Sequence, residues 1–258
     1  FGAQGFDYIG DSRADLAVWP HAAQRFTVSS LLPAGGQRLA GTPPAGGPAR
    51  WLKLLRVRHW VKNVLVFVAP LAAHQWAVAA SWHAALLTFA AFCAVCSSIY
   101  VVNDLFDLAS DRAHPSKRRR PLAAGDLQLA PAVLVSVALL AGGFALAWLA
   151  GWAAVAVIGV YVLVNAAYTS WLKRLPVYDV FCLAGLYTLR IVAGAVAVGV
   201  PLSAWLAAFS VFAFLSLALL KRAADIDRLA PDQVLPGRGY TGRDAAFVNG
   251  FGVGSAIA

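Results

Sequence analysis

Long apolar segments separated by short polar connections occupy most of the chain. One segment, 64–80, follows a basic stretch and is interrupted by Pro70, and we expect it to form the first membrane span. A further apolar run begins near Ala245 and has not reached spanning length by residue 258. Five other segments are long enough and poor enough in charge to cross about 30 Å of hydrocarbon as helices, and they cover 82–102, 129–149, 152–169, 180–200 and 202–220. The pattern predicts an all-α polytopic transmembrane helical bundle with six complete spans and part of a seventh.

The first 50 residues differ from the rest of the chain because they are rich in glycine, proline and polar residues. We interpret 1–40 as a short soluble N-terminal segment, 41–50 as a Pro- and Gly-rich linker and 51–258 as the membrane domain. The chain contains no methionine, so we expect it to be part of a larger protein, with a membrane domain that is incomplete at its C-terminal end.

Composition and charge support this class. Hydrophobic residues make up 60% of the chain and charged residues 13%, with a mean hydropathy of +0.68, whereas soluble domains carry roughly 25% charged residues. Lysines and arginines gather before the first predicted span and after the second, fourth and sixth, while the connections near 81, 150 and 201 carry none. The positive-inside rule then makes the charged loops and the N-terminus cytoplasmic, in a bacterial-type inner (plasma) membrane. The net charge of +9 is therefore a topology signal, and cations spread over such loops do not fit a nucleic-acid footprint.

A polar motif follows the second predicted span directly. Asp104, Asp107 and Asp111 stand at positions i, i+3 and i+7, so a continuing helix would place all three on one face with Asn103 at its edge. Carboxylates gathered in this way repel one another unless divalent cations bridge them, and Mg²⁺ held by carboxylates keeps its other positions for water and phosphate oxygens. We therefore predict a Mg²⁺-diphosphate site. The alternative is a set of solvated loop charges that balance the basic run 117–120.

This motif resembles the first aspartate-rich motif of the UbiA superfamily of intramembrane prenyltransferases. The matching pattern is Asn-Asp-x-x-Asp-x-x-x-Asp from Asn103, continued by Arg-x-His-Pro-x-Lys-Arg-x-Arg-Pro up to Pro121. Shorter matches, which extend the resemblance over residues 51 to about 250, are Trp-Val-Lys-Asn at 60–63, Tyr168 with Lys173-Arg174 and Asp179, and Leu-Arg-x-x-Ala-Gly at 189–194. The resemblance implies a helical bundle whose central cavity opens laterally to lipid, with two acidic motifs facing each other over its cytoplasmic mouth.

The resemblance also implies roles for individual residues. Asp104 and Asp107 would be catalytic, and both would hold Mg²⁺ together with Asp111. The implied substrates are a polyprenyl phosphate or diphosphate lipid and a diphosphate-bearing or aromatic small molecule, joined with loss of diphosphate. The residues implied in binding them are Lys62, Asn63, Asn103, Arg112, Lys117, Arg118, Arg120, Tyr168 and Lys173.

The second acidic motif should follow the sixth predicted span, where aromatic members of the family carry paired aspartates. This chain reads Lys221-Arg222-Ala-Ala-Asp225-Ile-Asp227 instead. We expect Asp225 to join the metal site and Lys221 or Arg222 to contact phosphate, and a simple Lys221–Asp225 helical ion pair is the alternative. A cation here favours an anionic co-substrate, so the motif resembles the decaprenyl-phosphate phosphoribosyltransferase branch. The other candidate is an aromatic prenyltransferase of the 4-hydroxybenzoate type, which acts in quinone or lipid biosynthesis.

Arg190 lies midway along the fifth predicted span, where a charge costs at least ~2.5 kcal/mol on insertion scales. Such a residue normally faces the bundle interior, so we expect a catalytic, diphosphate-binding arginine in the cavity. The alternative is an arginine that packs helices together through backbone carbonyls or Asn165. For Lys62 the alternative role is an interfacial anchor, and we expect His114 to be structural.

The N-terminal segment carries a second resemblance. Residues 5–16, Gly-Phe-Asp-Tyr-Ile-Gly-Asp-Ser-Arg-Ala-Asp-Leu, are similar to the last motif of the haloacid dehalogenase superfamily. The resemblance implies an apolar strand ending in Gly-Asp, with Asp11 and Asp15 helping to hold Mg²⁺ at a phosphatase site. The nucleophilic aspartate of that superfamily lies far upstream, and nothing in this chain supplies it. We expect the C-terminal remnant of a phosphatase-like domain fused to the transferase, with an inert cytoplasmic tail as the alternative.

Two other classes of function fit the sequence less well. A polytopic transporter would place its binding groups near the membrane midplane, often at broken helices in internal repeats, whereas this acidic cluster lies at the membrane edge. A purely structural subunit has no use for three carboxylates on one helical face. The sequence thus predicts an integral-membrane UbiA-type transferase that uses Mg²⁺ and a polyprenyl substrate.

Overall fold

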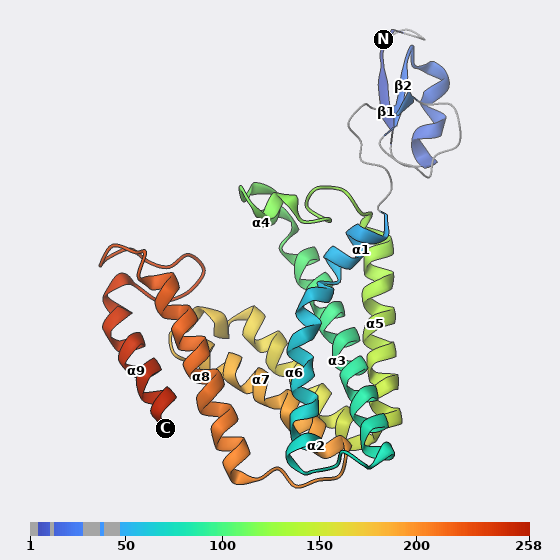
Figure 1. Ribbon diagram of the computed structural model, residues 1–258. Helices are drawn as coiled ribbons and strands as arrows, with labels where there is room; N and C mark the ends of the chain where they lie inside the picture. Colours follow the sequence, from blue (N-terminus) through green and yellow to red (C-terminus); the bar gives the residue numbers. More distant parts are fainter. Residues whose placement is uncertain (1–4, 11–12, 28–36, 39–46) are drawn as a thin grey trace. The chain divides into compact units, whose positions relative to one another are not determined.

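Figure 1 shows the computed structural model, which describes residues 5–10, 13–27, 37–38 and 47–258. The chain forms two compact units, Phe1–Leu54 with Asp104–Ala132 and Leu55–Asn103 with Val133–Ala258. Helices α3 (Ala79–Phe106) and α5 (Leu129–Ala150) each contribute residues to both units.

The first unit begins with a small parallel sheet in the strand order β1-β2-β3. Two short 3₁₀ helices, η1 and η2, connect β1 to β2. A Cβ atom on Gly10 would lie 2.6 Å from the Cβ of Asp15, so only a glycine allows the end of β1 to lie this close to η1. The elements are β1 (Tyr8–Gly10), η1 (Arg13–Ala17), η2 (Trp19–His21), β2 (Arg25–Thr27) and β3 (Gln37–Arg38).

Strand β1 ends at the glycine of the Gly-Asp pair that the second resemblance singled out. Of the two aspartates in that motif, Asp15 accepts a hydrogen bond from the Tyr8 hydroxyl at 3.0 Å, and Asp11 lies outside the described residues. A relation to phosphatases stays a prediction, as do the domain bounds 1–40, 41–50 and 51–258.

The rest of the first unit surrounds the connection between α3 and α5. Arg50 lies 3.5 Å from a carboxylate oxygen of Asp126, and the Lys53 ammonium donates to the Arg119 carbonyl oxygen at 3.3 Å. These contacts tie the first helix to the connection. The elements are α1 (Pro48–Leu54), α4 (Leu108–Ala113) and η4 (Lys117–Arg119).

Five helices in the described part of the chain are long and apolar enough to cross a membrane. Each corresponds to one of the five uninterrupted segments predicted from the sequence. Hydrocarbon offers no partner to a backbone amide, so such segments satisfy their amides internally as helices. The five are α3, α5, α6 (Trp152–Ser170), α7 (Tyr178–Ala197) and α8 (Ala204–Ile226), and η5 (Leu172–Arg174) lies between α6 and α7.

The segment 64–80 does not form the single long helix that was predicted. A 3₁₀ helix, η3 (Val57–Phe67), is followed by the short α2 (Val68–Ala72). Because a 3₁₀ helix rises about 2.0 Å per residue, the two together are about 30 Å long, although they begin earlier than predicted. They end before His74, whose left-handed backbone conformation (φ 56°) cannot continue a right-handed helix.

Helices α3, α6 and α7 pack with η3 around an apolar core in the second unit. Its buried residues include Phe92 of α3, Ile158 of α6, Leu186 of α7 and Val66 of η3. The backbones of α7 and η3 approach closely at Gly194, where a Cβ atom would lie 1.9 Å from the Val66 carbonyl oxygen. The glycine of the Leu-Arg-x-x-Ala-Gly pattern is therefore required by packing.

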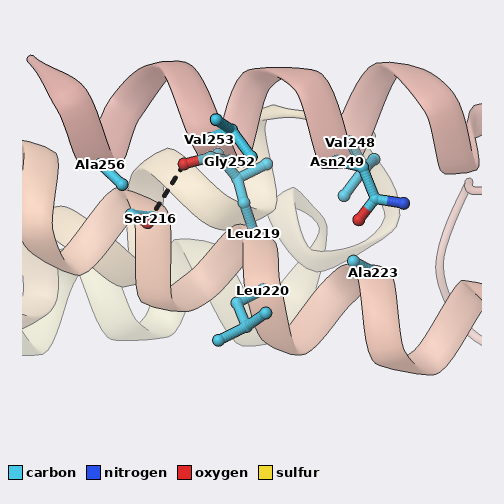
Figure 2. A pocket seen from close by; sticks show the side chains of 9 residues that line it. All are labelled: Ser216, Leu219, Leu220, Ala223, Val248, Asn249, Gly252, Val253 and Ala256. Carbon is cyan, nitrogen blue, oxygen red and sulfur yellow. Dashed lines mark hydrogen bonds between the residues drawn. The ribbon is translucent and has the colours of Figure 1, made fainter.

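The apolar run predicted to begin near Ala245 forms α9 (Ala245–Ile257), preceded by η6 (Gly242–Asp244). Helix α9 packs along α8, and Figure 2 shows the groove that they line. The Ser216 hydroxyl donates to the Gly252 carbonyl oxygen at 3.1 Å across this groove. A Cβ atom on Gly252 would lie 3.3 Å from Leu219, so the small residue allows the helices to approach closely.

Candidate functional site

The first cluster of candidate residues lies where α3 ends. Asp104 in the last turn of α3 and Asp111 in α4 are 3% and 1% exposed. Both carboxylates accept hydrogen bonds from Nη1 of Arg120, at 3.1 Å for Asp104 Oδ1 and 2.6 Å for Asp111 Oδ2. One guanidinium therefore holds two buried carboxylates together, and these three side chains carry a net negative charge.

The helical path through this motif is interrupted at Asp107. Helix α3 ends at Phe106 and α4 begins at Leu108, with Asp107 between them at φ −85° and ψ 4°. The Asp111 amide still donates to the Asp107 carbonyl oxygen at 2.8 Å, so one turn of helical hydrogen bonding persists. The Asp107 side chain is nevertheless exposed. The prediction that all three carboxylates share one continuous helical face therefore fails at Asp107.

The oxygens of this cluster fit a hard divalent cation. Oδ1 of Asp111 is buried and has no hydrogen-bond partner in the described part of the chain, which is costly for a charged group. Carboxylate oxygens are the protein ligands that Mg²⁺ prefers, usually one or two of them beside water and phosphate oxygens. No group of three or more His, Cys, Asp or Glu side chains is preassembled for a metal among residues 5–10, 13–27, 37–38 and 47–258. The cluster thus offers two buried carboxylates with the exposed Asp107 between them in sequence, and a metal site with all three as ligands stays a prediction.

The cations predicted to contact phosphate in this region differ in their surroundings. Arg120 is half-buried against the two aspartates, whereas Arg112, Lys117 and Arg118 are exposed. His114 is structural as expected, because its Nδ1 lies 3.2 and 3.4 Å from two backbone amides that donate to it. Arg120 therefore binds the two aspartates of the cluster. The exposed cations are accessible to a ligand from solvent.

Three other predicted residues lie in the second unit. Asn103 lines a cavity of about 190 Å³ together with Asn165. The Lys62 ammonium lies 5.7 Å from the ring centroid of Tyr187, a cation–π arrangement that suits an interfacial lysine. Lys173 is half-buried in η5. The roles predicted for these three residues stay predictions.

A second cluster in the second unit is built around Asp179, which is fully buried at the start of α7. Its carboxylate accepts hydrogen bonds from the Tyr240 hydroxyl at 2.6 Å, from Arg222 Nη2 at 2.7 Å and from Arg238 Nη1 at 3.2 Å. Arg222 also donates through Nη1 to Asp225 at 3.0 Å. Two aspartates and two arginines balance one another in charge, so the cluster can be buried without an excess charge.

The connection after α8 supplies two partners of Asp179. The Tyr240 hydroxyl also accepts a hydrogen bond from the Val177 amide at 2.7 Å, and Val177 has a φ of 70°, which a β-branched residue adopts only when its surroundings enforce it. Burial and the hydrogen bond to Asp179 raise the pKa of Tyr240 above its ordinary value. Burial alone would lower the pKa of Arg238, but its hydrogen bonds to Tyr168 and Asp179 raise it. Tyr240 therefore stays neutral and Arg238 stays charged.

These contacts revise the predicted second motif. Asp225 pairs with Arg222, whereas Lys221 is exposed, as is Asp227. Arg222 is 2% exposed, and its Nε has no hydrogen-bond partner among the described residues. Asp179 stood in the family pattern but received no role from the sequence. The signal available for it was a lone acidic residue at the first turn of an apolar helix.

Arg190 is buried in the middle of α7 at 5% exposure. Its Nε donates to Asn63 Oδ1 at 2.9 Å, its Nη2 donates to the Tyr161 hydroxyl at 3.0 Å, and its Nη1 donates to the Leu186 carbonyl oxygen. Its guanidinium carbon also lies 5.0 to 5.8 Å from three aromatic ring centroids. Most of its donors are occupied by protein groups, which favours the helix-packing alternative, with Asn63 in place of Asn165.

The chain matches the UbiA prenyltransferase family over residues 64–238. It is 39% identical over 268 residues to the uncharacterized protein y4nM of Sinorhizobium fredii, covering 99% of this chain and 51% of that protein. It is 41% identical to the decaprenyl-phosphate phosphoribosyltransferase of Corynebacterium glutamicum, over 71% of this chain and 57% of the relative. It is 42% identical to the nodulation protein NoeC of Azorhizobium caulinodans, over 75% and 63%. The chain thus spans less than two thirds of the length of each of these relatives.

Solved structures share the fold. A UbiA homolog from Archaeoglobus fulgidus, bound to GPP and Mg²⁺, aligns with a TM-score of 0.62 at 20% identity, over 81% of this chain and 75% of that one. A structure of digeranylgeranylglyceryl phosphate synthase aligns with a TM-score of 0.58 at 21% identity, over 81% and 75%. The family match over residues 64–238, together with five helices of membrane-spanning length, shows that the chain is an integral membrane protein that belongs to the UbiA prenyltransferase family.

Proposed function

We propose that the protein is a Mg²⁺-dependent membrane transferase that joins a polyprenyl phosphate to a phosphoribosyl group with loss of diphosphate. The observation that carries this proposal is the aspartate cluster at the end of a membrane-spanning helix. It contains two buried carboxylates, Asp104 and Asp111, and one carboxylate oxygen without a partner among the described residues. A diphosphate-bearing substrate that arrives with Mg²⁺ is the ligand that such a cluster favours.

Relatives support both the co-substrate and the metal. The decaprenyl-phosphate phosphoribosyltransferases of Corynebacterium glutamicum and Mycobacterium tuberculosis are 41% and 37% identical to this chain over 188 residues. The UbiA homolog from Archaeoglobus fulgidus is bound to Mg²⁺ and to GPP, a prenyl diphosphate. Both findings favour a reaction in which a metal-bound diphosphate leaves.

In the proposed reaction, an oxygen of the lipid phosphate attacks the anomeric carbon of phosphoribosyl diphosphate. The bond from that carbon to the diphosphate oxygen breaks, and diphosphate leaves with the electron pair. When bound, Mg²⁺ neutralises the charge that develops on this leaving group. Asp104 and Asp111 would hold the metal, with Asp107 as a further ligand, while Arg120 keeps the two buried carboxylates in position. The exposed cations after α4 would bind the remaining phosphate charge.

The second cluster supports an anionic co-substrate over a neutral aromatic one. Arg222 is buried, is held by two aspartates and keeps its Nε without a partner among the described residues. A fixed guanidinium with a remaining donor suits a phosphate oxygen. In this proposal Asp225 remains a metal ligand, and the exposed Lys221 provides a second phosphate contact.

A transfer assay on the purified protein in detergent with Mg²⁺ tests the proposal. One tube contains labelled phosphoribosyl diphosphate with polyprenyl phosphate, and the other contains labelled polyprenyl diphosphate with 4-hydroxybenzoate. We expect labelled lipid product in the first tube only, and we expect a chelator to abolish it. Product in the second tube only would identify an aromatic prenyltransferase and overturn the phosphoribosyl assignment.

Two variants test the metal site itself. Asp104→Asn and Asp111→Asn should each lower turnover about 100-fold or more, because each replaces a proposed metal ligand with a neutral one. Asp227→Asn makes the same chemical change at an exposed position and should behave like the wild type. Normal turnover in folded Asp111→Asn protein would refute the metal site.

A further inference from the structure

The second unit contains an apolar recess along α6 and α7. None of the residues of the two clusters lines it. Its volume is about 570 Å³, within the range of roughly 300–1,000 Å³ that is typical of ligand pockets. The residues that line it on α7 extend from Tyr178 to Val192, a distance of about 21 Å at 1.5 Å per residue. Val160 and Val164 of α6 and Val211 of α8 complete its walls.

The walls of this recess present few free polar atoms. The Thr188 hydroxyl donates to the Ala184 carbonyl oxygen at 3.0 Å, so its hydrogen is already used within α7. Gly185 lines the recess, and a Cβ atom built on it would meet no atom within 4 Å. The absence of a side chain at this position therefore adds to the open volume of the recess. Such a lining suits a hydrocarbon chain better than a polar ligand.

Cations and aromatic side chains gather at the end of the recess where Tyr178 lies. The connection from α6 to α7 carries Lys173 and Arg174 here, and neither forms an ion pair with a described residue. The neighbouring Asp179 is already held by two other arginines. Trp171 and Tyr178 are 57% and 65% exposed, which is typical of aromatic residues at a membrane–water interface. This end therefore lies at headgroup level with an excess of positive charge.

We propose that an anionic phospholipid binds in this recess, with one acyl chain along α6 and α7 and its phosphate against Lys173 and Arg174. The hydrocarbon core of a bilayer is about 30 Å thick, so one leaflet accounts for about 15 Å. A recess of about 21 Å therefore matches one acyl chain and its headgroup level, whereas a long polyprenyl chain would extend beyond it. A neutral phospholipid gains the apolar contact alone, so the cations select for charge. This site does not depend on the proposed transfer reaction.

Native mass spectrometry of the purified protein tests this site. The protein is exchanged into dioleoyl phosphatidylglycerol or dioleoyl phosphatidylcholine at equal concentrations, and we expect phosphatidylglycerol to be retained preferentially. The double variant Lys173→Gln/Arg174→Gln should retain phosphatidylglycerol roughly 30-fold more weakly, because each cation near a membrane surface contributes about a fivefold factor. Its retention of phosphatidylcholine should not change.

A matched pair of glycine variants tests the apolar part. Gly185→Leu places a side chain in the recess and should reduce retention of both lipids. Gly159→Leu adds the same side chain on α6, where a Cβ atom also meets nothing within 4 Å, but this residue does not line the recess. It should retain both lipids like the wild type.

Three outcomes would overturn the proposal. Unchanged retention of phosphatidylglycerol by the folded Gln double variant would remove the headgroup contact. Equal behaviour of Gly185→Leu and Gly159→Leu would show that the recess is not where the chain binds. Retention of polyprenyl phosphate without retention of phosphatidylglycerol would assign the recess to a polyprenyl chain instead.

Discussion

Tyr240→Phe removes a single hydroxyl that makes two hydrogen bonds in the second cluster. This hydroxyl donates to Asp179 at 2.6 Å and accepts from the Val177 amide at 2.7 Å. A hydrogen bond to a charged group contributes about 1.5–3 kcal/mol, and the hydrogen bond of the partly buried Val177 amide contributes about 0.5–1 kcal/mol. Because Tyr240 lies outside the membrane-spanning helices, these aqueous values apply. We expect the free energy of unfolding to fall by about 2–4 kcal/mol.

Thermal unfolding of the purified protein in detergent, followed by circular dichroism, measures this loss as a midpoint lowered by roughly 5–15 °C. Tyr178→Phe is the matched control, since its side chain is exposed and its loss should change stability by less than about 0.5 kcal/mol. Asp179→Asn alone and combined with Tyr240→Phe gives the coupling between the two side chains. A Tyr240→Phe protein as stable as the wild type would refute the conclusion that this hydroxyl fixes the start of α7.

The remaining predictions concern packing, charge and pH. Gly194→Ala should prevent folded protein from accumulating in the membrane fraction, because its Cβ would lie 1.9 Å from a backbone carbonyl oxygen, whereas Gly159→Ala should accumulate normally. Arg190→Met should lower the free energy of unfolding by about 1–2 kcal/mol, because two interhelical hydrogen bonds are lost. A KM for the diphosphate co-substrate that rises much more than about twofold would instead show that Arg190 binds substrate. The pKa of Tyr240 is raised in the folded state, so on raising the pH the unfolded state releases the proton first. The stability that Tyr240 contributes should therefore be constant below about pH 9 and should be lost progressively above the ordinary tyrosine pKa of about 10. Unfolding midpoints of the wild type and Tyr240→Phe should therefore converge at high pH.

The sequence was sufficient to predict the five long helices and the beginning of α9. Spanning length and lack of charge are properties of a segment by itself, so they can be read without tertiary information. The segment 64–80 was less predictable for two physical reasons. Apolar character does not distinguish a 3₁₀ helix from an α-helix, and nothing in the pattern locates the left-handed residue at His74 that ends the helical path.

For the candidate site, the sequence could predict only contacts between residues that are close together on one helix. Spacing placed Asp104 and Asp111 near each other, but it gave no sign that Asp107 would be exposed between two helices. Around Asp225, spacing allowed either Lys221 or Arg222 as its partner, since both are close on a helical face. The choice is set by a buried aspartate 43 residues earlier in the chain, which no local periodicity reveals.

The partners of Asp179 are made late in synthesis, because Arg222, Arg238 and Tyr240 lie 43, 59 and 61 residues further along the chain. When α7 enters the membrane, the acid at its start has no cation and the strained Val177 has no hydroxyl to hold its amide. The carboxylate must therefore remain hydrated at the membrane surface until α8 and the connection after it have emerged. The start of α7 is thus held by side chains that are synthesised only later, one in α8 and two in the connection that follows it.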